Sequence, residues 1–180
     1  IEHGPITDDA NVDALLKQMI TVSSNEAANG LLSRIGNGDG KAAIATVAAT
    51  AQRYGFTSSE ELRTLTGMAS GNAVENWTST RDCGSFLSQV YAGTLVSKNA
   101  SERMMQLLLG QTRRTKIPAG VPSGVKVANK TGELAAVQND VAIVFGTHPY
   151  VLAVMSNDIS SAVAPSQITE LSRAVWDAAQ

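Results

Sequence analysis

The sequence predicts an α+β fold, in which a cluster of helices is followed by a three-stranded antiparallel meander and one closing helix. Apolar residues recur at helical spacing from residue 11 onwards, whereas β-branched residues alternate with other residues between residues 125 and 155. With 180 residues, of which 43% are hydrophobic, the chain is expected to form a single domain with a substantial core.

The chain begins with two predicted helices. Apolar side chains three and four residues apart predict the first one over residues 11–22. The apolar stripe consists of Val12, Leu15, Leu16, Met19 and Ile20. Ser23 and Glu26 then form a capping-box pattern, which predicts that a second helix starts at Ser23 and extends to about Ile35.

Further helices are expected on both sides of one long irregular segment. An alanine-rich helix is predicted over residues 41–54, and capping boxes within residues 57–61 indicate a short additional helical turn. Residues 65–80 lose all periodicity and are rich in Gly, Ser and Asn, which predicts a long surface loop of the kind that often carries function. Helical periodicity resumes over residues 80–91 and 100–109.

The C-terminal third contains the predicted strands. Pro118 and Pro122 mark an extended approach to a strand that begins near residue 125 and ends at Lys130-Thr131-Gly132. Two further strands, joined by a hairpin turn at Gly146-Thr147-His148-Pro149, and a final helix complete the meander. These last elements are expected at residues 140–145, 150–155 and 165–179.

Composition excludes several classes of function. The net charge of −2 argues against a nucleic-acid-binding surface, and no apolar run is long enough to span a membrane. Cys83 is the only cysteine, which excludes an intrachain disulfide and a thiolate metal cage. His3 and His148 have no acidic partner at a metal-binding spacing, so neither a metal nor another cofactor is expected. Because Ile1 is not an initiator methionine, we expect the chain to be part of a longer product.

The segment Lys130-Thr131-Gly132 combines three chemical groups that suit the binding of an anion and a carbonyl. Lys130 supplies a positive charge, Thr131 supplies a hydroxyl donor, and Gly132 leaves room for a ligand against the backbone. A simpler interpretation also exists, because such a segment is often only a solvated strand end.

Two distant motifs together resemble those of the penicillin-recognising serine hydrolases, and most closely those of class A β-lactamases and related D,D-peptidases. The first is SSNEAAN at residues 23–29, which is similar to the Ser-Asp-Asn element of that family, with Ser24 in place of the aspartate. The second is NKTG at residues 129–132, which is similar to the Lys-Thr-Gly strand. Simpler interpretations of the first motif are that Ser23 caps a helix and that Asn25 and Asn29 are solvated or pack against an adjacent loop.

The resemblance implies a role for each matching residue. Ser23 would pass a proton to the leaving nitrogen, and Lys130 would hold its hydroxyl. The remaining residues would bind the substrate. Asn25 would hold the amide side chain of the substrate, and Thr131 would bind the carboxylate of the substrate. The backbone N–H of Glu133 would donate to the oxyanion. Lys116 stands where other members place an arginine, and would supply charge to the carboxylate site.

The sequence also departs from the family pattern at the nucleophile. That residue belongs to a Ser-x-x-Lys motif on a helix well before Ser23, and residues 1–22 contain no such motif. Ser123 and Lys126 have the right spacing, but in a strand they would point to opposite faces about 10 Å apart. The chain alone is therefore expected to be inactive, as the C-terminal part of an incomplete catalytic domain that associates with its missing N-terminal segment or with another copy.

A second departure concerns the glutamate that activates water in class A β-lactamases. Residues 65–80 contain no Glu-Pro-x-x-Asn sequence, and only Glu60, Glu61 and Glu75 lie in or near this loop. Slow deacylation would favour a D,D-peptidase or transpeptidase acting on D-Ala-D-Ala peptides as an alternative to a β-lactam hydrolase. A non-catalytic binding module with the same cleft is a further alternative, and the resemblance implies an extracytoplasmic location in every case.

Overall fold

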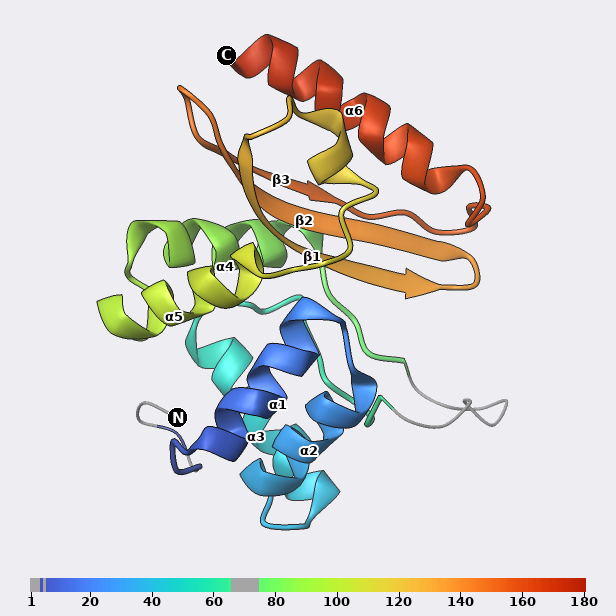
Figure 1. The fold of residues 1–180 in the computed structure, drawn as a ribbon. Coiled ribbons are helices and arrows are strands. Elements are labelled where there is room, and N and C mark those ends of the chain that lie inside the picture. The colour runs from blue at the N-terminus through green and yellow to red at the C-terminus, as the bar shows by residue number, and fades with distance from the viewer. Residues whose placement is uncertain (1–3, 5, 66–74) are drawn as a thin grey trace. The chain divides into compact units, whose positions relative to one another are not determined.

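The computed structural model describes Gly4, residues 6–65 and residues 75–180, and the chain divides into two compact units, Ile1–Asp82 and Cys83–Gln180 (Figure 1). Within the described residues, five α-helices and one short 3-10 helix precede a three-stranded antiparallel sheet, and one α-helix follows it. This order confirms the predicted α+β class.

Three helices form the described core of the first unit: α1 (Ala10–Thr21), α2 (Asn25–Ile35) and α3 (Gly40–Arg53). Helix α2 contacts both of the others, and the helices begin at capping side chains from Asp9, Ser24 and Asp39. The buried side chains are small or aliphatic, which allows the helices to pack closely. They are Val12, Ala27, Ala28, Leu31, Leu32 and Ala43.

The start of α2 corrects the predicted capping box. Ser24, and not Ser23, is the capping residue, because its Oγ accepts a hydrogen bond from the Ala27 N–H at 3.1 Å. Ser23 instead adopts a positive φ of 61°, a conformation in which non-glycine residues are uncommon. The helix therefore starts after Ser23, and the interpretation of Ser23 as a simple helix cap is wrong.

The region after α3 differs from its prediction as well. No helix forms over residues 57–61, because Glu60 pairs its backbone with Trp77 through hydrogen bonds of 2.9 and 3.0 Å. The Asn76 side chain adds hydrogen bonds to the N–H groups of Leu62 and Arg63. These contacts close the base of the predicted long loop, whose residues 66–74 lie outside the described part of the chain.

The second unit is built on a sheet of strands β1 (Lys126–Leu134), β2 (Val137–Phe145) and β3 (Tyr150–Val154), in the order β1-β2-β3. The predicted meander and the turn between β2 and β3 are confirmed. However, β1 runs two residues beyond Gly132, and β2 starts earlier than expected, at Val137. The segment Lys130-Thr131-Gly132 therefore lies within a hairpin strand and not at a strand end.

Helices surround this sheet. Helix α4 (Thr80–Ala92) starts at the end of the first unit, and α5 (Lys98–Leu109) and α6 (Ala164–Ala179) belong to the second. A short 3-10 helix, η1 (Ile117–Gly120), replaces the extended approach predicted from the prolines, because Pro118 occupies an early helical position, where its missing N–H costs nothing.

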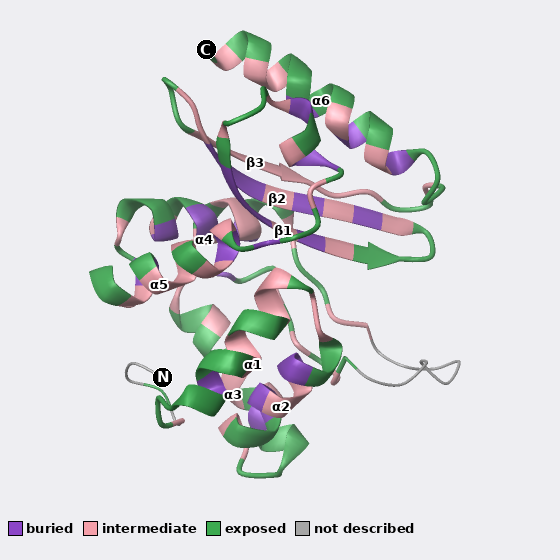
Figure 2. Ribbon diagram, viewed as in Figure 1, coloured by how far each residue is buried: buried purple, intermediate pink, exposed green. Residues whose placement is uncertain are grey.

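The sheet separates two packed layers. Buried apolar side chains of β1 and β2 pack with η1 and α6, in a cluster that comprises Ile117, Val127, Ala142, Val144 and Ile168. Figure 2 shows buried segments in both strands and in α6. On the opposite face, the ring of Phe145 lies 5.9 Å from that of Tyr91 on α4. The face toward α6 turns polar further along the strands, where Thr131, Glu133 and Asp140 lie.

Candidate active site

Strand β1 presents the predicted site residues on two different faces. Successive side chains of a strand point to opposite sides, so Lys130 and Gly132 share one face while Thr131 and Glu133 share the other. In the register of the hairpin, Thr131 lies opposite Asp140 and Glu133 lies opposite Gln138. Thr131 and Glu133 therefore belong to the layer that packs on η1 and α6.

The hairpin loop determines which backbone groups of β1 point outward. Leu134 and Val137 pair with each other on either side of a two-residue loop. In such a hairpin this closing pair is joined by backbone hydrogen bonds. Along each strand, residues whose backbone groups bond to the partner strand then alternate with residues whose N–H and C=O groups point away from it. The Val127 carbonyl fits this alternation, because it accepts a hydrogen bond from Arg114 Nη1 at 2.9 Å. The N–H groups of Thr131 and Glu133 accordingly point away from β2, at the edge of the described sheet.

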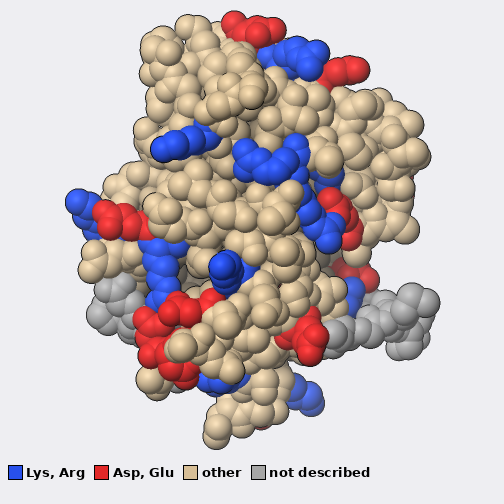
Figure 3. Space-filling view, in the orientation of Figure 1, with Lys and Arg blue, Asp and Glu red and all other residues tan. Residues whose placement is uncertain are grey.

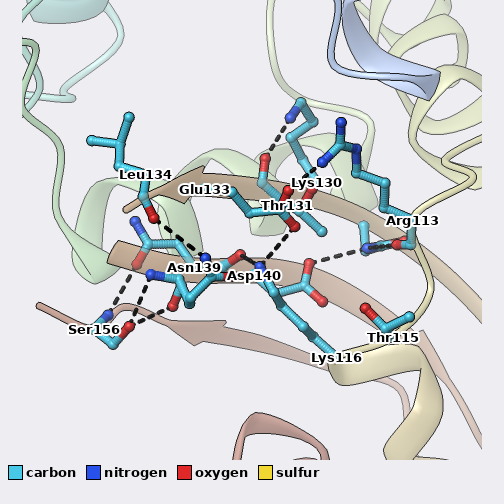
Figure 4. A network of polar contacts seen from close by, with 12 residues as sticks. Arg113, Thr115, Lys116, Lys130, Thr131, Glu133, Leu134, Asn139, Asp140 and Ser156 are labelled. Atoms are coloured by element: carbon cyan, nitrogen blue, oxygen red, sulfur yellow. Dashed lines mark hydrogen bonds and ion pairs between the residues drawn. The ribbon is translucent and has the colours of Figure 1, made fainter. Parts of the chain in front are cut away.

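Lys130 is half-buried, and its Nζ donates a hydrogen bond to the Thr131 carbonyl (Figure 4). Burial lowers the pKa of Lys130, and the positive charge of Arg113 lowers it further, whereas Glu133 and Asp140 act in the opposite direction. A lysine in this state gives up its proton more readily than a solvated one. Lys130 is therefore not a fully solvated lysine, and its role in the site stays a prediction.

Glu133 is held between two cations. Its Oε1 lies 3.0 Å from Lys116 Nζ, and its Oε2 contacts Arg113 (Figure 4). Burial acts to raise the pKa of Glu133, but the hydrogen bond and charge of Lys116, together with Arg113, outweigh it and leave this pKa below its usual value. The carboxylate is therefore firmly ionised near neutral pH.

Lys116 lies inside the second unit and not at its surface. Only 1% of it is exposed, and its Nζ also donates to the Asn139 carbonyl at 3.1 Å. Its predicted contact with a substrate carboxylate stays a prediction, and its burial behind Glu133 counts against direct access while Glu133 is in place.

A buried carboxylate lies next to this pair. Asp140 accepts hydrogen bonds from Asn129 Nδ2 and from the Ile117 N–H, both at 3.0 Å. Burial raises the pKa of Asp140 to about 6, although these two donors and the charge of Lys116 oppose the shift. Asp140 thus ties η1 to both strands of the hairpin.

Sequence reasoning missed the roles of Arg113, Asn129 and Asp140. One signal was present for Asp140, because it precedes Ala142 and Val144 at period two and so occupies an inward-facing strand position. A charged residue at such a position requires buried partners.

Thr131 has a buried hydroxyl that lacks a partner. The residue is 4% exposed, and its Oγ1 makes no hydrogen bond within the described part of the chain. An unsatisfied buried hydroxyl costs about 1–3 kcal/mol, and such a group in a folded protein needs an explanation.

The other predicted residues belong to the first unit. Ser23 occupies the turn between α1 and α2, and Asn25 is the exposed first residue of α2. Asn29 accepts a hydrogen bond from the Leu65 N–H at 2.9 Å, which confirms its interpretation as a residue that packs against the adjacent loop. The two units are described separately, so the convergence of Ser23 and Asn25 with Lys130 and Thr131 stays a prediction.

The three loop glutamates have different environments. Glu75 forms an ion pair of 2.7 Å with Arg63, and Glu60 pairs its backbone with Trp77. Burial raises the pKa of Glu61, with the charge of Arg63 acting against it. On the face shown in Figure 3, Lys and Arg side chains are intermixed with Asp and Glu side chains.

Comparison with known proteins identifies the family. A profile described as the beta-lactamase enzyme family matches residues 3–179, almost the whole chain. The chain belongs to the beta-lactamase enzyme family. The resemblance to penicillin-recognising serine hydrolases is thereby confirmed, while a search of curated proteins finds no match.

Solved structures related to this beta-lactamase family chain include three of similar fold. They are a beta-lactamase from Sphaerobacter thermophilus (TM-score 0.83, 24% identity), PBP-A (0.80, 25%) and the putative class A beta-lactamase PenP from Rhodopseudomonas palustris (0.80, 26%). Each match covers 93% of this chain, but only 62%, 60% and 65% of the respective structure. The chain thus spans about three fifths of the length of these relatives.

Two further findings concern the described part of this family member. It contains no group of three or more His, Cys, Asp or Glu side chains that could hold a metal ion. None of its helices combines the length and apolar character needed to cross a bilayer.

Proposed function

We propose that this chain forms most of a serine acyl-transfer domain that acts on β-lactams and receives its nucleophile from a segment outside residues 1–180. The observation that carries the proposal is the edge strand β1, which combines a half-buried Lys130 with outward N–H groups at Thr131 and Glu133. Together with the family match, this arrangement suits a strand along which an acyl substrate lies.

In this proposal Lys130 and Ser23 handle the proton. The lowered pKa of Lys130 reflects its burial, and an ammonium under such conditions stabilises negative charge on a neighbouring hydroxyl while exchanging protons readily. Ser23 would be that hydroxyl and would deliver a proton to the leaving nitrogen. Its removal from helix capping, which Ser24 performs, is compatible with this role.

The remaining residues would bind the substrate. The Glu133 N–H would donate to the developing oxyanion, an interaction typically worth about 3 kcal/mol per donor. The buried Thr131 hydroxyl and the charge of Lys116 would serve the substrate carboxylate, Gly132 would leave room beside the strand, and Asn25 would hold the substrate amide.

Chemistry of this type has a precedent among the similar structures. A single-substitution variant of PBP-A was solved as an acyl-enzyme complex with penicillin G, and this chain matches it at 25% identity over 93% of its length. We expect the longer product that contains this chain to form the same kind of covalent intermediate, through an upstream serine.

A D,D-peptidase or transpeptidase acting on D-Ala-D-Ala peptides is the second candidate. It is favoured by the loop glutamates, because Glu75 forms an ion pair of 2.7 Å with Arg63, and this contact occupies a carboxylate oxygen that could otherwise hold an attacking water. With a poor water-activating base, an acyl-enzyme would persist and could be attacked by an amine instead. Both activities would place the protein outside the cytoplasm.

Mass spectrometry after brief exposure to penicillin tests the proposal. The longer product should show a covalent adduct on a serine upstream of Ile1, whereas residues 1–180 alone should show neither an adduct nor β-lactam turnover.

An adduct on Ser23 in the 180-residue chain would refute the assignment of the nucleophile. Absence of an adduct from the longer product, with no hydrolysis, would leave a non-catalytic binding module. Rapid hydrolysis without an adduct would show that a glutamate such as Glu61 activates water.

A further inference from the structure

Lys116 and Arg113 form a site for an anion, and the carboxylate of Glu133 from the same chain occupies this site. Lys116 is 1% exposed, and its ammonium faces only the Asn139 carbonyl and the Glu133 carboxylate among the contacts described for this side chain. A buried ammonium must be paired, since an uncompensated buried charge is strongly destabilising. The buried carboxylate of Asp140 also interacts with the charge of Lys116, but Glu133 supplies the anionic oxygen to which this ammonium donates, at 3.0 Å. Lys116 therefore favours an anion at this position.

Glu133 reaches this position from the solvent side. Its side chain is 30% exposed, and its second oxygen contacts Arg113, which is 47% exposed. The carboxylate therefore separates the interior ammonium from water. A rotation of the Glu133 side chain would open a path to both cations without moving the backbone of β1.

We propose that the Glu133 carboxylate is an internal competitor for a carboxylate-binding site formed by Lys116 and Arg113, so that an anionic ligand binds there only when Glu133 is displaced. The exchange conserves charge, because one carboxylate replaces another beside Lys116. Glu133 itself can then be solvated at the protein surface, where an ionised carboxylate is stable.

Thr131 gives an external carboxylate one potential advantage over Glu133. Its Oγ1 is buried without a partner among the described residues, and it lies on the same face of β1, two positions before Glu133 (Figure 4). The Glu133 carboxylate leaves this hydroxyl unsatisfied. A ligand carboxylate that spans Lys116 and Thr131 would satisfy both groups.

This inference rests on the proposed function only for the identity of the natural ligand, the carboxylate of an acyl substrate. Its consequence is selectivity, because every anionic substrate must compete with a tethered carboxylate at high effective concentration. Substrates with a neutral group at this position would escape the competition.

The test measures acetate binding to the 180-residue chain at constant ionic strength, with chloride as the balancing anion. Glu133→Gln should bind acetate about tenfold more tightly than the unchanged chain, because the charged competitor is gone. Its melting temperature, lowered by the unpaired Lys116, should recover as acetate is added. Glu170→Gln, which removes an equal charge from the exposed surface of α6, is the matched control and should change neither quantity.

A second variant separates the site from a general effect of charge. Glu133→Gln combined with Lys116→Met removes both members of the buried pair and should fold without any gain in acetate affinity. Equal acetate affinity in the unchanged chain and in Glu133→Gln would overturn the inference. So would a Glu133→Gln variant that stays unfolded at every acetate concentration, because the anion should then have replaced the lost partner.

The outcomes distinguish this inference from the proposed function. If Glu133→Gln ignores acetate while the longer product still forms its penicillin adduct, only the internal competitor is refuted. If no adduct forms but acetate rescues Glu133→Gln, the site stands and the proposed chemistry fails.

Discussion

Individual residues of β1 show where sequence reasoning succeeds and where it stops. Lys130 was identifiable from the Lys-Thr-Gly segment, and its half-burial and lowered pKa agree with a chemical role. The partnership of Glu133 with Arg113 and Lys116 was not predictable, because it depends on how residues 113–117 fold back against the strand. Such a contact has no local sequence signature, since neither local spacing nor propensity encodes it.

The raised pKa of Asp140 predicts how the free energy of unfolding depends on pH. Its pKa rises from 3.8 to about 6 on folding, mainly through burial, so the folded chain binds more protons than the unfolded chain between these values. The stabilising contribution of protonated Asp140 is therefore fully present below pH 3.8 and is lost as the pH rises through about 6. The loss should amount to about 2–3 kcal/mol.

Urea unfolding of the unchanged chain and of Asp140→Asn between pH 4.5 and 7 measures this contribution. The amide introduced by the substitution cannot titrate, so the difference in unfolding free energy between the two proteins should change over this range in favour of the variant at the higher pH. Glu61, whose pKa is also raised, is common to both proteins and cancels. Parallel pH profiles would show that Asp140 does not titrate in this window.

The elements themselves were mostly predictable, and their misplaced ends have local causes. The hairpin between β1 and β2 turns at residues 135–136, both alanines, where none of the usual Asn, Asp or Gly turn residues is present. The sequence pattern therefore places the strand end at Gly132, although the chain stays extended through it. Pro118 likewise suggests extended structure but starts η1, because proline suits both conformations.

Helix α2 gives a prediction at the scale of an element. Because Ser24 Oγ caps α2 at the Ala27 N–H, Ser24→Ala should lower the unfolding free energy by about 1 kcal/mol. Ser23→Gly should be neutral or slightly stabilising, since glycine adopts the observed φ of 61° without strain. Thermal and urea unfolding of the two variants provide the measurement. A larger loss for Ser23→Gly than for Ser24→Ala would mean that Ser23 carries the structural role.

At the scale of the whole molecule, the order of elements and the family could be predicted because they depend on periodicity and on two well-spaced motifs. The described helices and the meander follow the predicted order, and the family profile covers residues 3–179. The assembly of the site depends on a different kind of information. The two motifs fall in separate compact units, and their approach requires tertiary contacts that no local pattern encodes.

The proposed chemistry predicts that Ser23 and Lys130 lie within reach of each other in the assembled protein. Ser23→Cys in a Cys83→Ser background would provide a single thiol for a short maleimide–succinimide linker, and peptide mapping would identify the lysine that becomes linked. We expect the linked lysine to be Lys130, whose lowered pKa also favours its reaction as the neutral amine.

Lys126 is the internal control, because it is exposed and lies on the same face of the strand as Lys130, four residues earlier. Cross-linking that favours Lys126, or that persists unchanged in Lys130→Arg, would place Ser23 away from Lys130 and remove the proton relay from the mechanism. Preferential linkage to Lys130 would establish that the two units bring the motifs together, which is the condition on which every step assigned to Ser23 depends.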